Sequence, residues 1–210
     1  IEEYLIQPGG LKPGPFGSTL TKGFYVESGY RVYGQEQVLA GSLAVGDYYI
    51  PHAKWLELID FCVMQDDILM TLVGVGTVGK VIVVKEPFEP GVINPRLIRI
   101  RPDCSKCYTN FLASLIPSTL IRRQFTQYAT GGTMPVLNGS IVRKIRLPII
   151  PLPEQETIAE RIEACNKALE AEQGTLSKLQ QQKQGLMHDL LTGRVRVKTE
   201  SLPPTEPVHV

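Results

Sequence analysis

Apolar residues follow their most regular pattern in the last third of the chain. From about residue 154 onward they recur at alternating spacings of four and three, which is the seam of a heptad repeat. Eight of the ten seam positions are apolar, namely Ile158, Ile162, Cys165, Leu169, Leu176, Leu179, Leu186 and Leu190. The pattern predicts one long helix within residues 151–193, and about 39 helical residues would span about 58 Å at about 1.5 Å per residue.

This helix has clear end signals but no partner within the sequence. Pro153 suits the first helical position, and Gly193 suits a residue that stops the helix. Gly174 and Gly185 each weaken the helix by about 1 kcal/mol relative to alanine. Because a helix cannot bury its own seam, we expect a second helix from another copy, from a part of the protein beyond this sequence or from a different subunit. The alternative is a helix packed on its own domain.

Residues 1–150 carry shorter patterns that are typical of a mostly β domain. The segment before Phe24 is rich in proline and glycine, which predicts loops. A helix is expected from about Thr109 to Tyr128, interrupted at Pro117, followed by a glycine loop, a further strand and a proline-marked exit. Runs typical of strands occur at Tyr30–Tyr33, Tyr48–Ile50, Ile68–Leu72, Val81–Val84 and Leu97–Ile100.

Together these patterns predict an α+β protein in three parts. A mostly β globular domain occupies residues 1–150, and one long coiled-coil-type helix occupies residues 151–193. Residues 194–210 hold three prolines and little apolar pattern, so we expect them to form a flexible tail.

The stretch "LMTLVGVGTVGKVIVVK" contains two glycine motifs that suggest a nucleotide site. Gly74, Gly76 and Gly79 spell G-x-G-x-x-G, and with Lys80 they also begin a P-loop. Both motifs require a helix after the glycines, whereas β-branched residues follow here and favour a strand. Val81 also stands where a P-loop needs serine or threonine. We therefore predict a β-hairpin, and a nucleotide-dependent enzyme is the less favoured alternative.

Cysteine, histidine and hydropathy add few constraints. Cys104-x-x-Cys107 could form half of a zinc site, but no second pair of ligands accompanies it, so no metal or cofactor is expected. The three histidines show no ligand or triad spacing. No apolar run is long enough to cross a bilayer, so the cytoplasm is the expected location. The chain begins without methionine, and we expect it to be a fragment of a longer protein or a trimmed chain.

The overall charge of +1 hides an uneven distribution. Residues 1–79 carry four Lys and Arg against nine Asp and Glu, whereas residues 80–146 carry eleven against three. A middle segment this basic can meet a polyanion such as DNA, because neutralised phosphates release their counterions. The alternative is a solvated basic face without a partner.

Several motifs in consistent order resemble the specificity subunit of type I restriction–modification systems. "GPFGSTLTKGFYV" is similar to the opening of a target-recognition domain in that family, and "DDILMTLVGVGTVGKVIVV" is similar to its internal hairpin. "GVINPRLIRIRPD" and "ATGGTMPVLNGSIVRKIRLPIIPLPEQETIAERI" resemble a later strand and the exit into the conserved helix. "LQQQKQGLMHDLLTGRVRV" resembles the end of the conserved region. Asp66 stands where the family pattern has glycine, and the Gly131-Gly132 pair also departs slightly from it.

The resemblance implies a protein that recognises DNA and performs no chemistry. Full subunits of that family are expected to have two recognition domains, whose paired long helices set the distance between two half-sites. Methylation subunits and a motor-nuclease subunit complete the complex, which methylates adenine and cleaves DNA. With one domain and one helix, this chain is expected to be the C-terminal half of a full subunit or a half-subunit that dimerises.

Candidate contacts to double-stranded DNA follow from charge and loop position. The cations expected at phosphates or bases are Lys22, Lys80, Arg96, Arg122, Arg123, Arg143 and Lys144. Polar residues expected to read bases are Gln127, Tyr128, Thr130, Thr133 and Asn138. A coiled-coil scaffold or adaptor without a role on DNA is the competing hypothesis.

Overall fold

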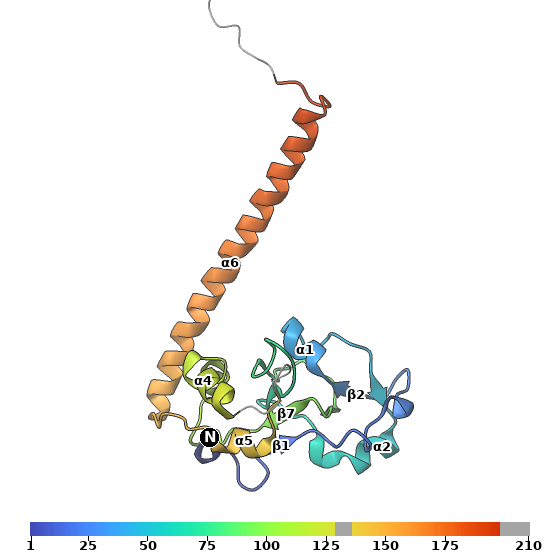
Figure 1. The fold of residues 1–210 in the computed structure, drawn as a ribbon, viewed down its shortest axis with the longest axis vertical. Coiled ribbons are helices and arrows are strands. Elements are labelled where there is room, and N and C mark those ends of the chain that lie inside the picture. Colours follow the sequence, from blue (N-terminus) through green and yellow to red (C-terminus); the bar gives the residue numbers. More distant parts are fainter. Residues whose placement is uncertain (129–135, 198–210) are drawn as a thin grey trace, which may run out of the picture. The chain divides into compact units, whose positions relative to one another are not determined.

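The computed structural model describes residues 1–128 and 136–197, and it has an α+β fold with two sheets and a long C-terminal helix (Figure 1). The α+β fold class expected from the sequence is confirmed. The chain forms two compact units, Ile1–Ile162 and Glu163–Val210.

A four-stranded antiparallel sheet forms the centre of the first unit. Its order is β1 (Leu11–Pro13), β7 (Leu97–Ile100), β4 (Ile68–Thr71) and β5 (Val81–Val83). Every residue of the two central strands is buried. Because side chains alternate along a strand, β4 and β7 supply two separate hydrophobic clusters, one on each face. The β4–β5 pair confirms the predicted hairpin.

A smaller sheet packs beside it, in the order β3 (Tyr49–Ile50), β2 (Tyr30–Tyr33) and β6 (Gly91–Ile93). The β2–β3 pair is antiparallel and the β2–β6 pair is parallel. Three short elements lie among these strands in the chain, namely α1 (Gln35–Ala40), α2 (His52–Glu57) and the 3-10 helix η3 (Ile59–Phe61). Two further 3-10 helices precede the sheet, η1 (Glu2–Tyr4) and η2 (Lys22–Phe24).

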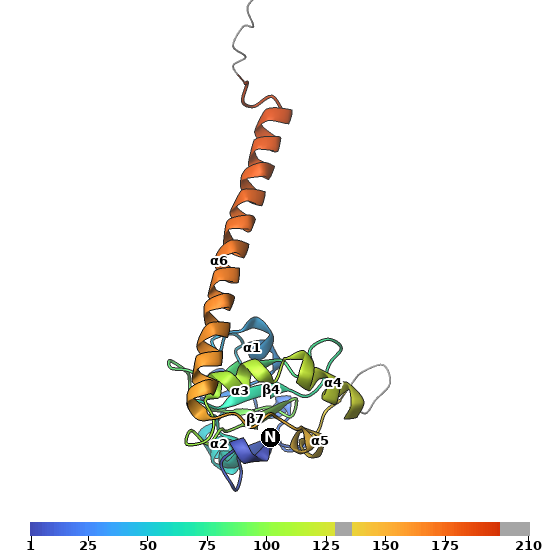
Figure 2. The same ribbon diagram turned by 90° about the vertical axis from the view of Figure 1, so that its left-hand side faces the viewer.

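Three helices cover one face of the four-stranded sheet (Figure 2). The segment expected to be an interrupted helix forms α3 (Thr109–Leu115) and α4 (Thr119–Tyr128), and the break lies at Pro117 as predicted. The prediction of a strand after the glycine loop is wrong, because this segment forms helix α5 (Gly139–Lys144). Its β-branched residues face the core, and Asn138 caps the helix by accepting a hydrogen bond from the Ile141 N–H at 2.9 Å.

Helix α6 (Leu152–Leu191) is continuous, close to the predicted range. Its first turns belong to the first unit, where Gln155 and Ala159 are buried and Ile158 is partly buried. From Ile162 onward the apolar seam residues are exposed, and Leu169, Leu176, Leu179 and Leu186 are more than half exposed. None of the helices in the described ranges is long and apolar enough to cross a membrane.

Candidate nucleic-acid interface

Two arginines of the basic segment 80–146 stabilise the fold. Arg99 is buried and donates to the carbonyl oxygens of Asp60 and Cys62 at 3.1 and 2.7 Å. Arg101 holds the fully buried Asp67 through two hydrogen bonds of 2.7 and 2.8 Å. Burial lowers the pKa of the Arg99 guanidinium, and the neighbouring Arg101 adds to this shift. These two arginines stabilise the sheet, so the charge excess overstates the basic surface.

The hairpin turn and helix α4 bring a first group of predicted cations together. Gly79 has a φ of +77°, and a Cβ added there would lie 2.9 Å from Cε2 of Phe125 on α4. The exposed Lys80 therefore follows a turn that packs against α4. On the exposed face of this helix, Arg122 and Arg123 line a shallow hollow of about 410 Å³ with Thr119 and Thr126. Gln127 and Tyr128 are exposed in its last turn.

The hairpin geometry does not provide a phosphate cradle of the P-loop or dinucleotide-binding type. Those sites need a glycine loop that opens onto a helix N-terminus. Here the loop after Thr71 returns directly into β5, and the backbone N–H of Gly79 donates to the carbonyl oxygen of Thr71 at 3.0 Å. The loop therefore closes a hairpin.

A second group lies in a cleft of about 560 Å³ lined by Lys22 from η2 and Arg96 from the β6–β7 turn. The backbone N–H of Arg96 donates to Oδ1 of Asn94 at 2.9 Å, and its carbonyl oxygen accepts from the Leu72 N–H at 2.9 Å. These bonds fix the turn that carries Arg96 against the four-stranded sheet.

One side chain links the two groups. Gln35 lines the cleft, and its Nε2 donates to the carbonyl oxygen of Val73, at the start of the glycine loop. The loop ends at Gly79, which packs against Phe125 of α4. Five predicted cations therefore lie along one continuous series of contacts from the cleft to α4: Lys22, Arg96, Lys80, Arg122 and Arg123.

The two cations on α5 do not join this series. Arg143 forms an ion pair with Glu2, with 3.4 Å between Nε and Oε1, and Lys144 is exposed on the same short helix. Helices α1 and α4 lie toward the upper side of the domain in both ribbon views, whereas α5 lies toward the lower side (Figures 1 and 2). Among the polar candidates, Asn138 uses its side-chain oxygen to cap α5, and Thr130 and Thr133 lie outside the described residues.

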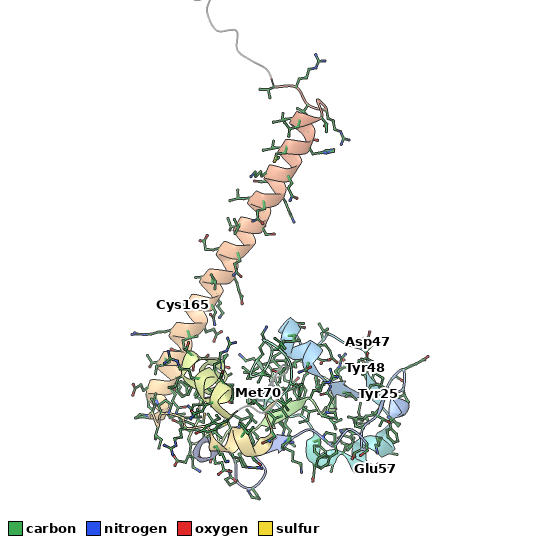
Figure 3. The ribbon with its side chains drawn as sticks, in the orientation of Figure 1. Tyr25, Asp47, Tyr48, Glu57, Met70 and Cys165 are labelled. Carbon is green, nitrogen blue, oxygen red and sulfur yellow. The ribbon has the colours of Figure 1, made fainter. Side chains whose placement is uncertain are left out.

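The cleft also contains residues that the sequence did not single out. The rings of Tyr25 and Tyr48 lie with their centroids 5.0 Å apart, and both are labelled in Figure 3. Glu36 lines the same cleft. Burial raises the pKa of the Tyr25 hydroxyl, and the charge of Glu36 and the hydroxyl of Tyr48 add to the shift. Tyr25 follows the predicted Lys22 contact by three residues, which is a signal in the sequence, whereas Tyr48 is distant in the sequence and joins the cleft only in the fold.

Comparison with known families decides the identity of this fold. The sequence matches the type I restriction modification DNA specificity domain over residues 21–181, which is most of the chain. The chain belongs to that family. The resemblance inferred from its sequence motifs is thereby confirmed.

Two specificity subunits of Methanocaldococcus jannaschii are similar to this family member. The type I restriction enzyme MjaVIII specificity subunit is 26% identical over 119 residues, which are 57% of this chain and 28% of that subunit. The putative type I restriction enzyme MjaX specificity subunit is 32% identical over 74 residues, 35% of this chain and 17% of that subunit. The matched segments therefore span less than a third of either relative.

Solved structures show the same fold. A chain from work on complex assembly and conformational transition of the type I R-M system aligns with a TM-score of 0.57 at 16% identity, over 90% of this chain and 48% of that one. The HsdS subunit from Thermoanaerobacter tengcongensis aligns at 0.51 and 21% identity, over 68% and 36%. The S subunit from M. genitalium aligns at 0.50 and 14% identity, over 85% and 42%.

Proposed function

We propose that this chain reads one half of a bipartite DNA target for a type I restriction–modification complex. In this proposal it directs adenine methylation and DNA cleavage by partner subunits and is not itself an enzyme. The observation that carries the proposal is the set of exposed cations that lie along this series of contacts, from Lys22 and Arg96 in the cleft to Lys80, Arg122 and Arg123 beside α4, in a domain of the DNA specificity family.

The arrangement suits the physics of DNA binding. Cations on an exposed edge can neutralise phosphates and release counterions, which supplies affinity without sequence preference. Polar side chains between the cations can then reach the base edges in a groove. We assign that second task to Gln127 and Tyr128, close to Arg123 on α4, and to the residues of the cleft.

Helix α6 supports the proposal that the chain works as part of an assembly. Its seam leaves several leucines more than half exposed, which is unfavourable in water for a helix that stays alone. We assign this seam to a second conserved helix, from the same full subunit or from a dimer mate, and we assign methylation and motor-nuclease subunits as further partners. Such a complex acts on cellular DNA, so we place it in the cytoplasm.

Duplex binding as a function of salt tests the proposal. We expect the chain to bind labelled duplex DNA at about 50 mM salt and to lose affinity steeply by about 200 mM. Replacing both Arg122 and Arg123 with alanine should weaken binding to all duplexes and reduce the salt slope by about 2. The measurement is fluorescence anisotropy of a labelled duplex across a salt series.

The matched control removes two exposed cations from a different part of the chain. Lys167→Ala with Lys178→Ala changes the net charge by the same amount, but both residues lie on the exposed surface of α6 and off its heptad seam. This control should leave the salt slope unchanged. A wild-type chain with no duplex affinity at low salt would instead support the scaffold hypothesis, for which the exposed seam is the favouring observation.

A further inference from the structure

The cleft between η2 and the β6–β7 turn holds an unusual combination of charges. Lys22 and Arg96 line it together with the carboxylate of Glu36, which comes from the first turn of α1. Among the described residues, neither a hydrogen bond nor an ion pair occupies the Glu36 carboxylate. Tyr25 and Tyr48, whose ring centroids lie 5.0 Å apart, line the same cleft as Glu36.

An unpaired carboxylate argues against a phosphate inside this cleft. Two like charges about 4 Å apart repel each other, and the repulsion becomes stronger when the surface around them is partly desolvated. A nucleobase edge is a better occupant, because a carboxylate accepts hydrogen bonds from exocyclic amino groups in the major groove. The tyrosine rings add a flat apolar surface, and the flanking cations can hold the neighbouring phosphates.

The cleft is built on a fixed scaffold, as recognition requires. Gln37 is buried, and its Oε1 accepts from the Gly34 N–H at 2.7 Å, which holds the first turn of α1 that carries Glu36. Arg31 is also buried and donates to the carbonyl oxygens of Val45 and Gly46 at 3.0 and 2.7 Å. These bonds hold the loop that leads into Tyr48. The Tyr48 ring and the Glu36 carboxylate are therefore positioned before DNA binds.

We propose that Glu36 is a specificity-determining residue, which accepts a hydrogen bond from the exocyclic amino group of an adenine or cytosine in the half-site. This inference rests on the proposed function and names the chemistry that the cleft reads. It predicts one position of the recognised half-site where an amino group in the major groove is required.

Selection of duplexes from a randomised pool identifies that position. The full chain is used to select binding sequences, and adenine or cytosine should be strongly enriched at one position. Wild-type protein is then titrated with the selected duplex and with a duplex that lacks only the amino group, carrying purine for adenine or 2-pyrimidinone for cytosine. We expect a loss of affinity of about tenfold or more, as one lost base contact costs about 1 to 3 kcal/mol.

Variants of Glu36 assign that loss to the residue. With Glu36→Met the two duplexes should bind within about threefold of each other, because the hydrogen-bond acceptor is gone while the side-chain length is nearly kept. Glu27→Met is the matched control, since it makes the same substitution at an exposed residue that does not line the cleft. The control should keep the wild-type discrimination.

Each outcome decides a different claim. If wild-type protein binds no duplex, the proposed function and this inference both fail. If it selects a sequence but tolerates removal of the amino group at every adenine and cytosine, the inference alone is overturned. The same holds if Glu36→Met keeps the full discrimination. The titration of wild-type protein needs no variant, so the inference stays testable even if Glu36→Met does not fold.

Discussion

The side-chain amide of Gln155 is bonded to the backbone of Tyr108, with its Oε1 accepting from the Tyr108 N–H at 2.9 Å. Its Nε2 donates to the carbonyl oxygens of Lys106 and Ile150 at 3.0 and 2.7 Å. Gln155 is fully buried, although it lies in the first turns of a helix whose later residues are exposed. One side chain therefore joins the start of α6 to the turn before α3.

Loss of this amide should destabilise the first unit. Gln155→Ala removes the partner of the Tyr108 N–H and of two carbonyl oxygens in partly buried hydrogen bonds, so we expect the free energy of unfolding to fall by about 1 to 3 kcal/mol. Urea denaturation followed by circular dichroism measures the change. Gln181→Ala, at an exposed position of the same helix, is the control and should change stability by less than about 0.5 kcal/mol. Equal stabilities for the two variants would show that the amide bonds are not needed.

Two glycines of the hairpin loop should differ in their tolerance of alanine. Gly76 and Gly79 both have positive φ, +69° and +77°, but an added Cβ at Gly76 meets no atom within 4 Å. At Gly79 the same carbon would lie 2.9 Å from the ring of Phe125. We expect Gly76→Ala to lower the free energy of unfolding by about 1 kcal/mol, because alanine is strained in this backbone conformation. Gly79→Ala should lower it by about 1 to 2 kcal/mol more, because α4 must shift.

The same pair of variants reports on the interface. Because Lys80 follows Gly79 and α4 carries Arg122 and Arg123, a displaced α4 should also weaken DNA binding in the Gly79→Ala variant. Thermal unfolding and the anisotropy titration measure the two effects. If both variants lose the same stability and the same affinity, the contact between Gly79 and Phe125 does not hold α4 in place.

The buried thiol of Cys107 should be unreactive in the folded protein. Burial raises its pKa to about 12, and the neighbouring Cys104 and Asp103 add to the shift. The thiolate is the reactive form, so at about pH 8 iodoacetamide should modify the exposed Cys104 and Cys165 and spare Cys107. Peptide mass spectrometry of the labelled chain shows which sites react. Rapid modification of Cys107 without unfolding would contradict its burial.

Alkaline pH should destabilise the fold through the same thiol. In the unfolded chain Cys107 ionises near its ordinary pKa of 9.0, whereas in the folded chain it stays protonated up to about 12. The unfolded state therefore loses its proton first, and the free energy of unfolding falls as pH rises above 9. Between about pH 8 and about pH 10 the fall from this group is about 1 kcal/mol. In the Cys107→Ala variant the free energy of unfolding should fall correspondingly less between the two pH values. Urea denaturation at each pH measures this difference.

The exposed seam of α6 should pair with a second copy of itself when no other helix is present. Two heptad seams bury each other's leucines, so we expect concentration-dependent dimers in sedimentation velocity at tens of micromolar protein. A Kd of about 1 micromolar corresponds to a binding free energy of about 8 kcal/mol. Replacing Leu176 and Leu179 with glutamate should abolish the dimer. Ser177→Glu with Gln181→Glu adds the same charge off the seam and should not. A wild-type chain that stays monomeric at the highest soluble concentration would contradict self-pairing.

Elements with strong local patterns were predictable from the sequence. The runs Tyr30–Tyr33 and Leu97–Ile100 form strands with those bounds, because β-branched and apolar side chains fit a sheet buried on both faces. The edge strand β1 and the strand β6 were missed, since each has three residues and includes a proline or a glycine. The sequence predicts a strand after the glycine loop, but segment 139–144 forms a helix, which the Asn138 cap and the burial of Ile141 and Val142 favour.

The long helix and its apolar seam follow from the residue order alone, because helical periodicity depends only on neighbours three and four positions apart. The cleft depends on contacts between distant segments. Lys22, Glu36, Tyr48 and Arg96 meet there because β2 pairs with both β3 and β6, and this pairing brings η2, α1 and the β6–β7 turn side by side. Such pairings are set by which strands bury each other, a property of the folded chain that no local pattern contains.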